Sequence, residues 1–265
     1  MTNENEHQKL TLHDIDVNVV RKGSGPPLVM LHGGGGPISA MPFADRLAER
    51  FEIIAPTHPG FGGTPIPDRF DDIQDLSFLY LDLLEALDVR DAVLMGFSMG
   101  GWAAASVAVM TTERLSKLIL VDAVGIKPGG REDRDIADIF ALRPEHLAEL
   151  MWHDTANAPN MAEMSDEQLQ VMIANRTALA MYTWDPYMHD PRLKHRLHRI
   201  DIPTLLIWGE SDGLVSTDYG KAYRDLIPGA QLEIIAGAGH SPQAEQPKAF
   251  AEHVIQFASE EVTGS

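Results

Sequence analysis

The sequence predicts an α/β fold, in which a mostly parallel sheet is flanked by helices and carries an inserted helical cap. From Pro27 onward, short apolar runs alternate with longer amphipathic stretches, a pattern typical of the strand–helix units that build a parallel sheet. The short runs are almost entirely apolar, as expected of strands that are buried on both faces. The alternation stops between Lys127 and His198, and this gap predicts the cap.

Two edge strands, six further strands and five flanking helices are expected in chain order. Residues 10–20 alternate between polar and apolar side chains, which predicts an antiparallel hairpin at the edge of the sheet. Apolar runs predict strands at residues 28–31, 52–55, 92–95, 118–121, 204–207 and 232–235. Helical spacing predicts helices at residues 41–50, 73–87, 100–110, 218–226 and 247–258.

The interrupted alternation also predicts the domain organisation. The segment without strands is rich in methionine, histidine and acidic residues, with helical spacing at residues 144–152 and 165–181. We therefore expect one core formed by residues 1–126 and 199–265, with residues 127–198 inserted as a helical cap. A length of 265 residues fits a single domain with such an insertion.

Composition excludes several classes of function. The sequence is 44% hydrophobic and 23% charged, which is typical of a globular protein, and no apolar run approaches the roughly 20 residues of a membrane span. A net charge of −18 would repel phosphate backbones and anionic membranes, so neither nucleic acid nor a membrane is expected as a partner. The polar, acidic N-terminus and the absence of cysteine favour a cytoplasmic protein, either a monomer or a homodimer.

The most informative chemical motif is G-x-S-x-G at residues 96–100, with Ser98 at its centre. It follows a predicted buried strand and precedes an alanine-rich helix, which is the strand–turn–helix context of a nucleophilic serine. The small residues two before and two after Ser98 allow the close packing that such a sharp turn requires. Ser98 is therefore the candidate nucleophile.

With these residues the chain resembles the α/β-hydrolase family, in particular its small capped serine hydrolases, which include esterases and C–C bond hydrolases. The resemblance extends from Pro27 to Phe257, nearly the whole chain. It implies the mostly parallel, eight-stranded α/β-hydrolase sheet with a helical cap.

A glycine-rich loop at residues 33–36 follows the first apolar strand, and glycine lets backbone N–H groups approach a substrate oxygen. By resemblance, the N–H groups of Gly34 and Met99 form an oxyanion hole, with Gly35 in place of Gly34 if the loop register differs by one. His32 is expected to brace this loop. A dinucleotide loop would need glycine at position 38, which is Ile38, so no nucleotide site is expected.

Two loops after later strands supply the candidate acid and base. Asp212 follows the strand at 204–207, and His240 follows the last strand, so the order Ser98, Asp212, His240 is that of the family. His240 would take the serine proton, while Asp212 would hold the imidazole in the required tautomer. Asp122, at the end of another strand, and Glu210 are alternative acids.

The serine nucleophile favours acyl transfer, so the expected activity is hydrolysis of a small carboxylic ester through an acyl-enzyme at Ser98. By resemblance, two alternatives are a C–C bond hydrolase of a ring-cleavage product and a cofactor-free haloperoxidase acting as a perhydrolase. The C–C hydrolases typically have tryptophan directly after the histidine, whereas this chain has Ser241. An alternative from another class is a non-catalytic small-molecule receptor on the same fold.

Large side chains of the cap are candidates for an apolar substrate pocket. They are Trp152, Met181, Tyr182, Trp184 and Tyr187. The histidines of the cap lack a recognisable ligand spacing such as H-E-x-x-H, so no metal and no cofactor are expected.

Overall fold

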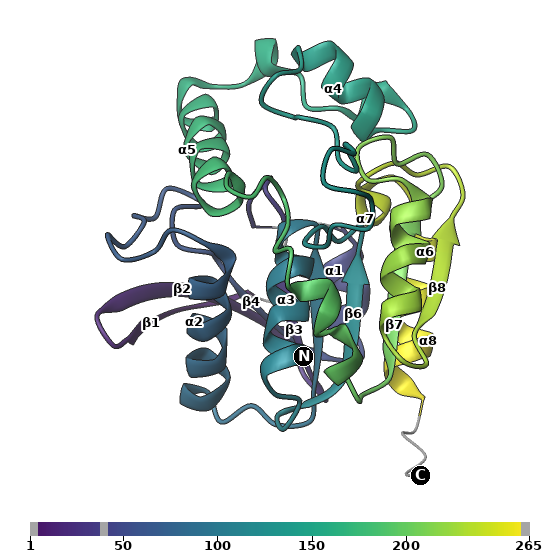
Figure 1. Cartoon of the computed structure of the whole chain (residues 1–265). Helices are drawn as coiled ribbons and strands as arrows, with labels where there is room; N and C mark the ends of the chain where they lie inside the picture. Colours follow the sequence, from purple (N-terminus) through teal and green to yellow (C-terminus); the bar gives the residue numbers. More distant parts are fainter. Residues whose placement is uncertain (1–4, 38–41, 261–265) are drawn as a thin grey trace.

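The computed structural model describes residues 5–37 and 42–260 and contains the predicted α/β sheet (Figure 1). Its eight strands are β1 (Glu6–Leu12), β2 (Ile15–Gly23), β3 (Pro27–Leu31), β4 (Glu52–Pro56), β5 (Ala92–Phe97), β6 (Leu115–Val121), β7 (Thr204–Gly209) and β8 (Gln231–Ile235). The strand order is β1-β2-β4-β3-β5-β6-β7-β8. β2 pairs antiparallel with β1 and β4, and all other pairs are parallel. The predicted fold class is confirmed.

Helices cover both faces of the sheet because successive strand residues point to opposite sides. Leu28 and Met30 of β3 pack in the cluster that contains α1 (Pro42–Ala48) and α8 (Pro247–Ser259). Val29 and Leu31 pack in the cluster that contains α2 (Ile73–Ala86), α3 (Met99–Met110) and α6 (Thr217–Leu226). Within the described part of the chain, no helix combines the length and the apolar character that a membrane span requires.

The elements differ from the sequence-based expectations mainly at their ends. The edge hairpin is longer than residues 10–20, because β2 continues to Gly23 and pairs with β4 there. The helix predicted at residues 41–50 begins with Met41, which lies outside the described residues, and α1 ends at Ala48. A short helix that was not predicted, α7 (Pro242–Glu245), starts at Pro242, a residue suited to the first turn of a helix.

Between β6 and β7, residues 127–198, here called the cap segment, contain α4 (Pro144–Met151), α5 (Asp166–Thr183) and short 3₁₀ turns. The 3₁₀ turns cover Thr155–Asn157, Met161–Glu163, Leu193–His195 and Leu197–Arg199, the last of which extends one residue past the segment. Ser165 caps α5: its hydroxyl accepts from the Gln168 N–H, and the Gln168 side chain accepts from the Ser165 N–H. Figure 1 shows α4 and α5 beyond the same end of the sheet, well apart from each other.

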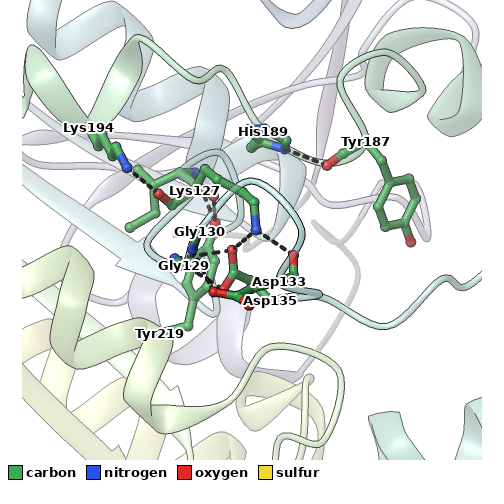
Figure 2. Close-up of polar contacts among 10 residues, drawn as sticks. Lys127, Gly129, Gly130, Asp133, Asp135, Tyr187, His189, Lys194 and Tyr219 are labelled. Atoms are coloured by element: carbon green, nitrogen blue, oxygen red, sulfur yellow. Dashed lines mark hydrogen bonds and ion pairs between the residues drawn. The ribbon is translucent and has the colours of Figure 1, made fainter.

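The two ends of the cap segment are tied to each other (Figure 2). Lys127 Nζ donates to Asp133 O at 2.6 Å and to Asp135 Oδ2 at 2.5 Å, which closes the loop that enters the cap. Lys194 Nζ, on the returning chain, donates to Lys127 O at 2.7 Å. Asp190 N also donates to Gly125 O at 3.0 Å. The entering and leaving chains therefore form one hydrogen-bonded base beneath the cap segment.

Candidate active site

Ser98 occupies a tight turn between the end of β5 at Phe97 and the start of α3 at Met99. Its φ of 50° lies in the left-handed region, which is uncommon for a residue with a side chain. A Cβ at Gly96 would lie 2.2 Å from Gly100 O, and a Cβ at Gly100 would lie 2.2 Å from the carbonyl oxygen of residue 31. Glycine is therefore required on both sides of the serine, for the steric reason that the sequence motif suggested.

His240 and Asp212 meet Ser98 at this turn. His240 Nε2 lies 3.1 Å from Ser98 Oγ, and His240 Nδ1 lies 2.7 Å from Asp212 Oδ2. Because an ionised carboxylate only accepts hydrogen bonds, the proton belongs on Nδ1, and the Nε2 lone pair faces the serine hydroxyl. The side chains of His240 and Asp212 are 5% and 0% exposed, so this chain of hydrogen bonds is shielded from water.

The backbone holds Asp212 in the orientation that reaches the histidine. Asp212 Oδ1 accepts from Leu214 N and Val215 N, each at 2.9 Å, which leaves Oδ2 for His240. Of the alternative acids, Asp122 accepts instead from the N–H of residue 209 at 2.9 Å, and Glu210 accepts from the N–H of residue 237 at 3.4 Å. Among the described residues, Asp212 is thus the carboxylate hydrogen-bonded to His240 Nδ1.

The candidate oxyanion donors lie on the two loops next to Ser98. Met99 is the first residue of α3, where N–H groups have no partner within the helix. The glycine loop begins beside the serine, because a Cβ at Gly33 would lie 3.2 Å from Ser98 Cβ. Gly34 follows directly in the chain. The roles of Gly34, Gly35 and Met99 in an oxyanion hole remain predictions.

The buried rings of His32, His58 and Tyr80 form a hydrogen-bonded network that positions the glycine loop. His58 donates its backbone N–H to His32 Nε2 at 3.0 Å, so the His32 proton is on Nδ1, which donates to Gly33 O at 2.8 Å. His58 Nε2 donates to His32 O at 2.7 Å, and Tyr80 donates its hydroxyl to His58 Nδ1. Since a peptide unit is planar and trans, fixing Gly33 O also fixes the direction of the Gly34 N–H. Sequence analysis missed Tyr80.

Both histidine rings must be neutral for this network, which predicts acid-sensitive stability. Burial lowers the pKa of His58 from its ordinary value of 6.5 to about 4, and burial with the nearby His58 ring lowers the pKa of His32 as well. Between pH 6.5 and 4 the unfolded chain binds protons that the folded chain does not bind. The free energy of unfolding should therefore fall as the pH falls through this range, by about 1.4 kcal/mol per pH unit for each ring.

Denaturant unfolding of the wild type and of His58→Gln from pH 7.5 to 4.5 tests this expectation. His58→Gln should be less stable at pH 7.5 but should show a shallower loss of stability towards acid. His146→Gln, a replacement of an exposed histidine on α4, should keep the wild-type slope. An identical slope for wild type and His58→Gln would contradict the explanation.

The cap segment contacts the loops that carry the acid and the base. Leu150 O accepts from Gly213 N at 2.9 Å, and Met151 O accepts from His240 N at 2.7 Å. Both acceptors lie at the C-terminal end of α4, where carbonyl groups lack partners within the helix. The position of α4 is therefore coupled directly to the backbone of His240.

Glu245 strengthens this connection, and sequence analysis did not identify it. Its carboxylate accepts from Gly239 N at 2.7 Å, Asp154 N at 3.0 Å and His153 N at 3.2 Å. One acceptor-only side chain thus joins the loop before His240 to the chain after α4. The acidic residue five positions after His240 was the available signal in the sequence.

Asn175 makes the corresponding connection from α5 and was also missed. It is 5% exposed; its Nδ2 donates to Gly35 O, and its Oδ1 accepts from Gly62 N, both at 2.9 Å. One turn further along α5, Leu179 covers the loop, because a Cβ at Gly34 would lie 2.6 Å from Leu179 Cδ2. A polar residue on the same side of the helix as Leu179 was the available signal.

The predicted pocket residues of the cap have different surroundings. Tyr182 and Tyr187 donate their hydroxyls to backbone carbonyl oxygens at 3.1 and 2.8 Å, so both help to pack the cap segment. Trp152 is partly buried at the end of α4. Met181 and Trp184 are 45% and 62% exposed, because α5 turns its opposite side to the core. This exposure argues against a pocket role for these two residues, and the pocket assignment as a whole stays a prediction.

Comparisons with known proteins agree with this fold. Residues 28–253 match a family described as the alpha/beta hydrolase family. A 2-hydroxy-6-oxo-6-(2'-aminophenyl)hexa-2,4-dienoic acid hydrolase from Metapseudomonas resinovorans is 27% identical, with 92% of this chain and 88% of that protein covered. A bacterial membrane phospholipase A shares the fold with a TM-score of 0.81, 24% identity, and coverage of 96% of this chain and 85% of that chain. A carboxylesterase from Bacillus subtilis shares it with a TM-score of 0.73, 20% identity, and coverage of 98% and 93%.

Proposed function

Because the chain belongs to the alpha/beta hydrolase family, we propose that it is a serine hydrolase that cleaves a small carboxylic ester through an acyl-enzyme on Ser98. The observation that carries the proposal is the hydrogen-bonded series Ser98 Oγ, His240 and Asp212 at the turn between β5 and α3. A nucleophile, a base and an orienting acid within hydrogen-bond distance are the parts that acyl transfer requires.

In this reaction Ser98 Oγ attacks the ester carbonyl carbon while His240 Nε2 takes the hydroxyl proton. The negative charge on the carbonyl oxygen is stabilised by the N–H groups of Met99 and Gly34, at about 3 kcal/mol for each donor. The ester C–O bond then breaks, and His240 gives the proton to the leaving alkoxide. Water, deprotonated by His240, attacks the carbonyl carbon of the acyl-enzyme. The bond from that carbon to Ser98 Oγ breaks, His240 returns the proton to Ser98 Oγ, and the carboxylic acid is released.

We propose that the cap segment limits the length of the substrate. Leu179 lies against the glycine loop, and α4 is hydrogen-bonded to the loops of Asp212 and His240, so both cap helices are held close to the reacting groups. Cap helices held in this position leave limited room for the acyl chain beyond the carbonyl carbon. The substrate class that fits is a short, mostly apolar ester.

Hydrolysis of p-nitrophenyl esters of increasing acyl length tests the size limit. We expect kcat/KM to be highest for short acyl chains and to fall for long ones. Leu179→Ala removes the side chain beside Gly34 and should move the maximum to longer chains. The matched control Met181→Ala changes an exposed residue of the same helix and should leave the maximum in place. A steady rise of kcat/KM with chain length in the wild type would instead indicate an open, lipase-like site.

A second candidate is hydrolysis of a C–C bond, which is favoured by the relative that is named as a hydrolase of a hexadienoic acid. Against this candidate, the residue after His240 is Ser241, whereas tryptophan is typical of the hydrolases of ring-cleavage products. We therefore rank it below ester hydrolysis. The same nucleophile and base would act in either reaction.

One set of assays separates the candidates. Purified protein is offered p-nitrophenyl acetate, a 2-hydroxy-6-oxo-hexa-2,4-dienoate, and acetate with hydrogen peroxide, while a fluorophosphonate reports on Ser98. Ester hydrolysis over many turnovers, with stoichiometric labelling of Ser98, supports the proposal. Preferred cleavage of the dienoate would identify a C–C hydrolase, and preferred formation of peracetate would identify a perhydrolase. Binding without turnover would indicate a receptor.

A further inference from the structure

A second carboxyl group is buried beside the acid of the candidate triad. Asp122, directly after β6, is 1% exposed, and its backbone N–H donates to Ile207 O at 3.0 Å. One carboxylate oxygen of Asp122, one of Asp212 and one ring nitrogen of His240 all lie within 4.8 Å of one another. The proposed reaction uses His240 and Asp212, and it gives no role to Asp122.

The hydrogen bonds of the two carboxyl groups are unequal. Asp212 accepts three: two from backbone N–H groups and one from His240. Asp122 Oδ1 accepts one, from Gly209 N at 2.9 Å, while the buried Oδ2 has no partner among the described residues. An ionised carboxylate at this depth with one donor would be strongly disfavoured, and more so beside the negative charge of Asp212.

The groups facing Asp122 give no positive charge to offset a second carboxylate. Asp212 faces it from the loop after β7, and His240 faces it from the loop after β8. No lysine or arginine in the described structure forms an ion pair with Asp122. A protonated Asp122 removes the repulsion and converts its unpartnered oxygen into a hydrogen-bond donor.

We propose that Asp122 is an uncharged positioning residue of the triad, which donates a hydrogen bond from its carboxyl group to Asp212 and holds the Asp212 carboxylate against His240. This inference rests on the proposed role of Ser98, His240 and Asp212 in hydrolysis. In agreement, burial and then the charge of Asp212 raise the pKa of Asp122 well above its ordinary value. Two carboxyl groups thus carry a single negative charge beside the imidazole.

Asp122→Asn and Asp122→Gly distinguish this role from the alternatives. The asparagine side chain is uncharged and can donate to Asp212 as the protonated acid does, so kcat should fall less than about threefold. Glycine accepts the φ of 42° at this position but removes the donor, and kcat should fall at least about tenfold with little change in KM.

The decisive readout is the titration of His240, followed by NMR of histidine-labelled protein and assigned by the loss of its signal in His240→Gln. Asp122→Asn should leave the midpoint of this titration unchanged, because no charge is removed. Asp122→Gly should move the midpoint up, because an Asp212 carboxylate without its donor stabilises the imidazolium more strongly. If Asp122 were ionised, Asp122→Asn would lower the midpoint by about one pH unit or more, which would overturn the proposal.

Infrared spectroscopy gives an independent check at pH 8. The difference spectrum of wild type minus Asp122→Asn should contain the C=O band of a protonated carboxylic acid, and the absence of this band would overturn the proposal. An Asp122→Gly variant with wild-type kcat and an unchanged His240 titration would likewise reduce Asp122 to a packing residue. The NMR and infrared measurements need no turnover, so they stay interpretable even if ester hydrolysis is absent.

Discussion

Replacing Ser98 by alanine is expected to lower kcat for ester hydrolysis by at least about 10³-fold, because the substitution removes the attacking oxygen. Stability should change little: the Ser98 hydroxyl is hydrogen-bonded to His240, and the backbone contacts of the turn do not depend on it. Both residues carry a Cβ, so the substitution leaves the left-handed strain at this position unaltered. The measurement is kcat on p-nitrophenyl acetate, together with the thermal unfolding midpoint.

The matched control is Ser106→Ala, which removes a serine hydroxyl from α3, the helix that directly follows Ser98. It should retain wild-type kcat and should still react with a fluorophosphonate, whereas Ser98→Ala should not be labelled. An unchanged rate in a purified Ser98→Ala protein, free of contaminating esterase, would exclude Ser98 as the nucleophile. The hydrolysis would then require another group in the chain.

The sheet was predictable from sequence because its strands are short, apolar and separated by helices with a clear period. Each of the six predicted apolar runs lies within one of the strands β3 to β8. The edge of the sheet was less accessible: the extension of β2 to Gly23 depends on pairing with β4, which starts at Glu52. Local patterns contain little information on such a non-local pairing.

In the candidate site, too, residues in local motifs were predictable from the sequence, whereas residues that depend on non-local packing were not. Ser98, Asp212 and His240 each stand in a local motif at the end of a strand, so the sequence predicted them from these motifs together with the resemblance to the α/β-hydrolase family. Asn175 acts through Gly35, which is 140 residues away in the chain, and its amide has no motif. Its role depends on where the cap segment packs on the core, and single-sequence patterns do not determine that arrangement.

Asp122 occupies a position between these cases. Its place at the end of β6 made it a candidate acid from the sequence. The structure separates it from Asp212 by the partners of each carboxyl group, because Asp122 accepts from Gly209 N and Asp212 reaches His240. Which of the two carboxylates reaches His240 depends on distances of a few ångströms between loops. The order of the residues in the sequence does not give these distances.

Asp212→Asn is expected to lower kcat on the order of 10⁴-fold, the size of effect known for the equivalent change in serine proteases. The backbone determines how the new amide sits. Leu214 N and Val215 N need an acceptor, so they hold the asparagine oxygen where Asp212 Oδ1 is now. The amide nitrogen then faces His240 Nδ1 and donates to it, which moves the imidazole proton to Nε2. In that tautomer His240 cannot accept the Ser98 proton.

The thermal unfolding midpoint should change little in Asp212→Asn, because both backbone hydrogen bonds are kept, and the loss should therefore appear in kcat. Asp122→Asn is the matched comparison, since it makes the same chemical change in a neighbouring buried acid that does not contact His240 Nδ1. Its kcat should fall less than about threefold. If Asp122→Asn proves to be the crippling change and Asp212→Asn is nearly silent, the acid of the triad belongs to the end of β6. The hydrogen bond between Asp212 and His240 would then have only a structural role.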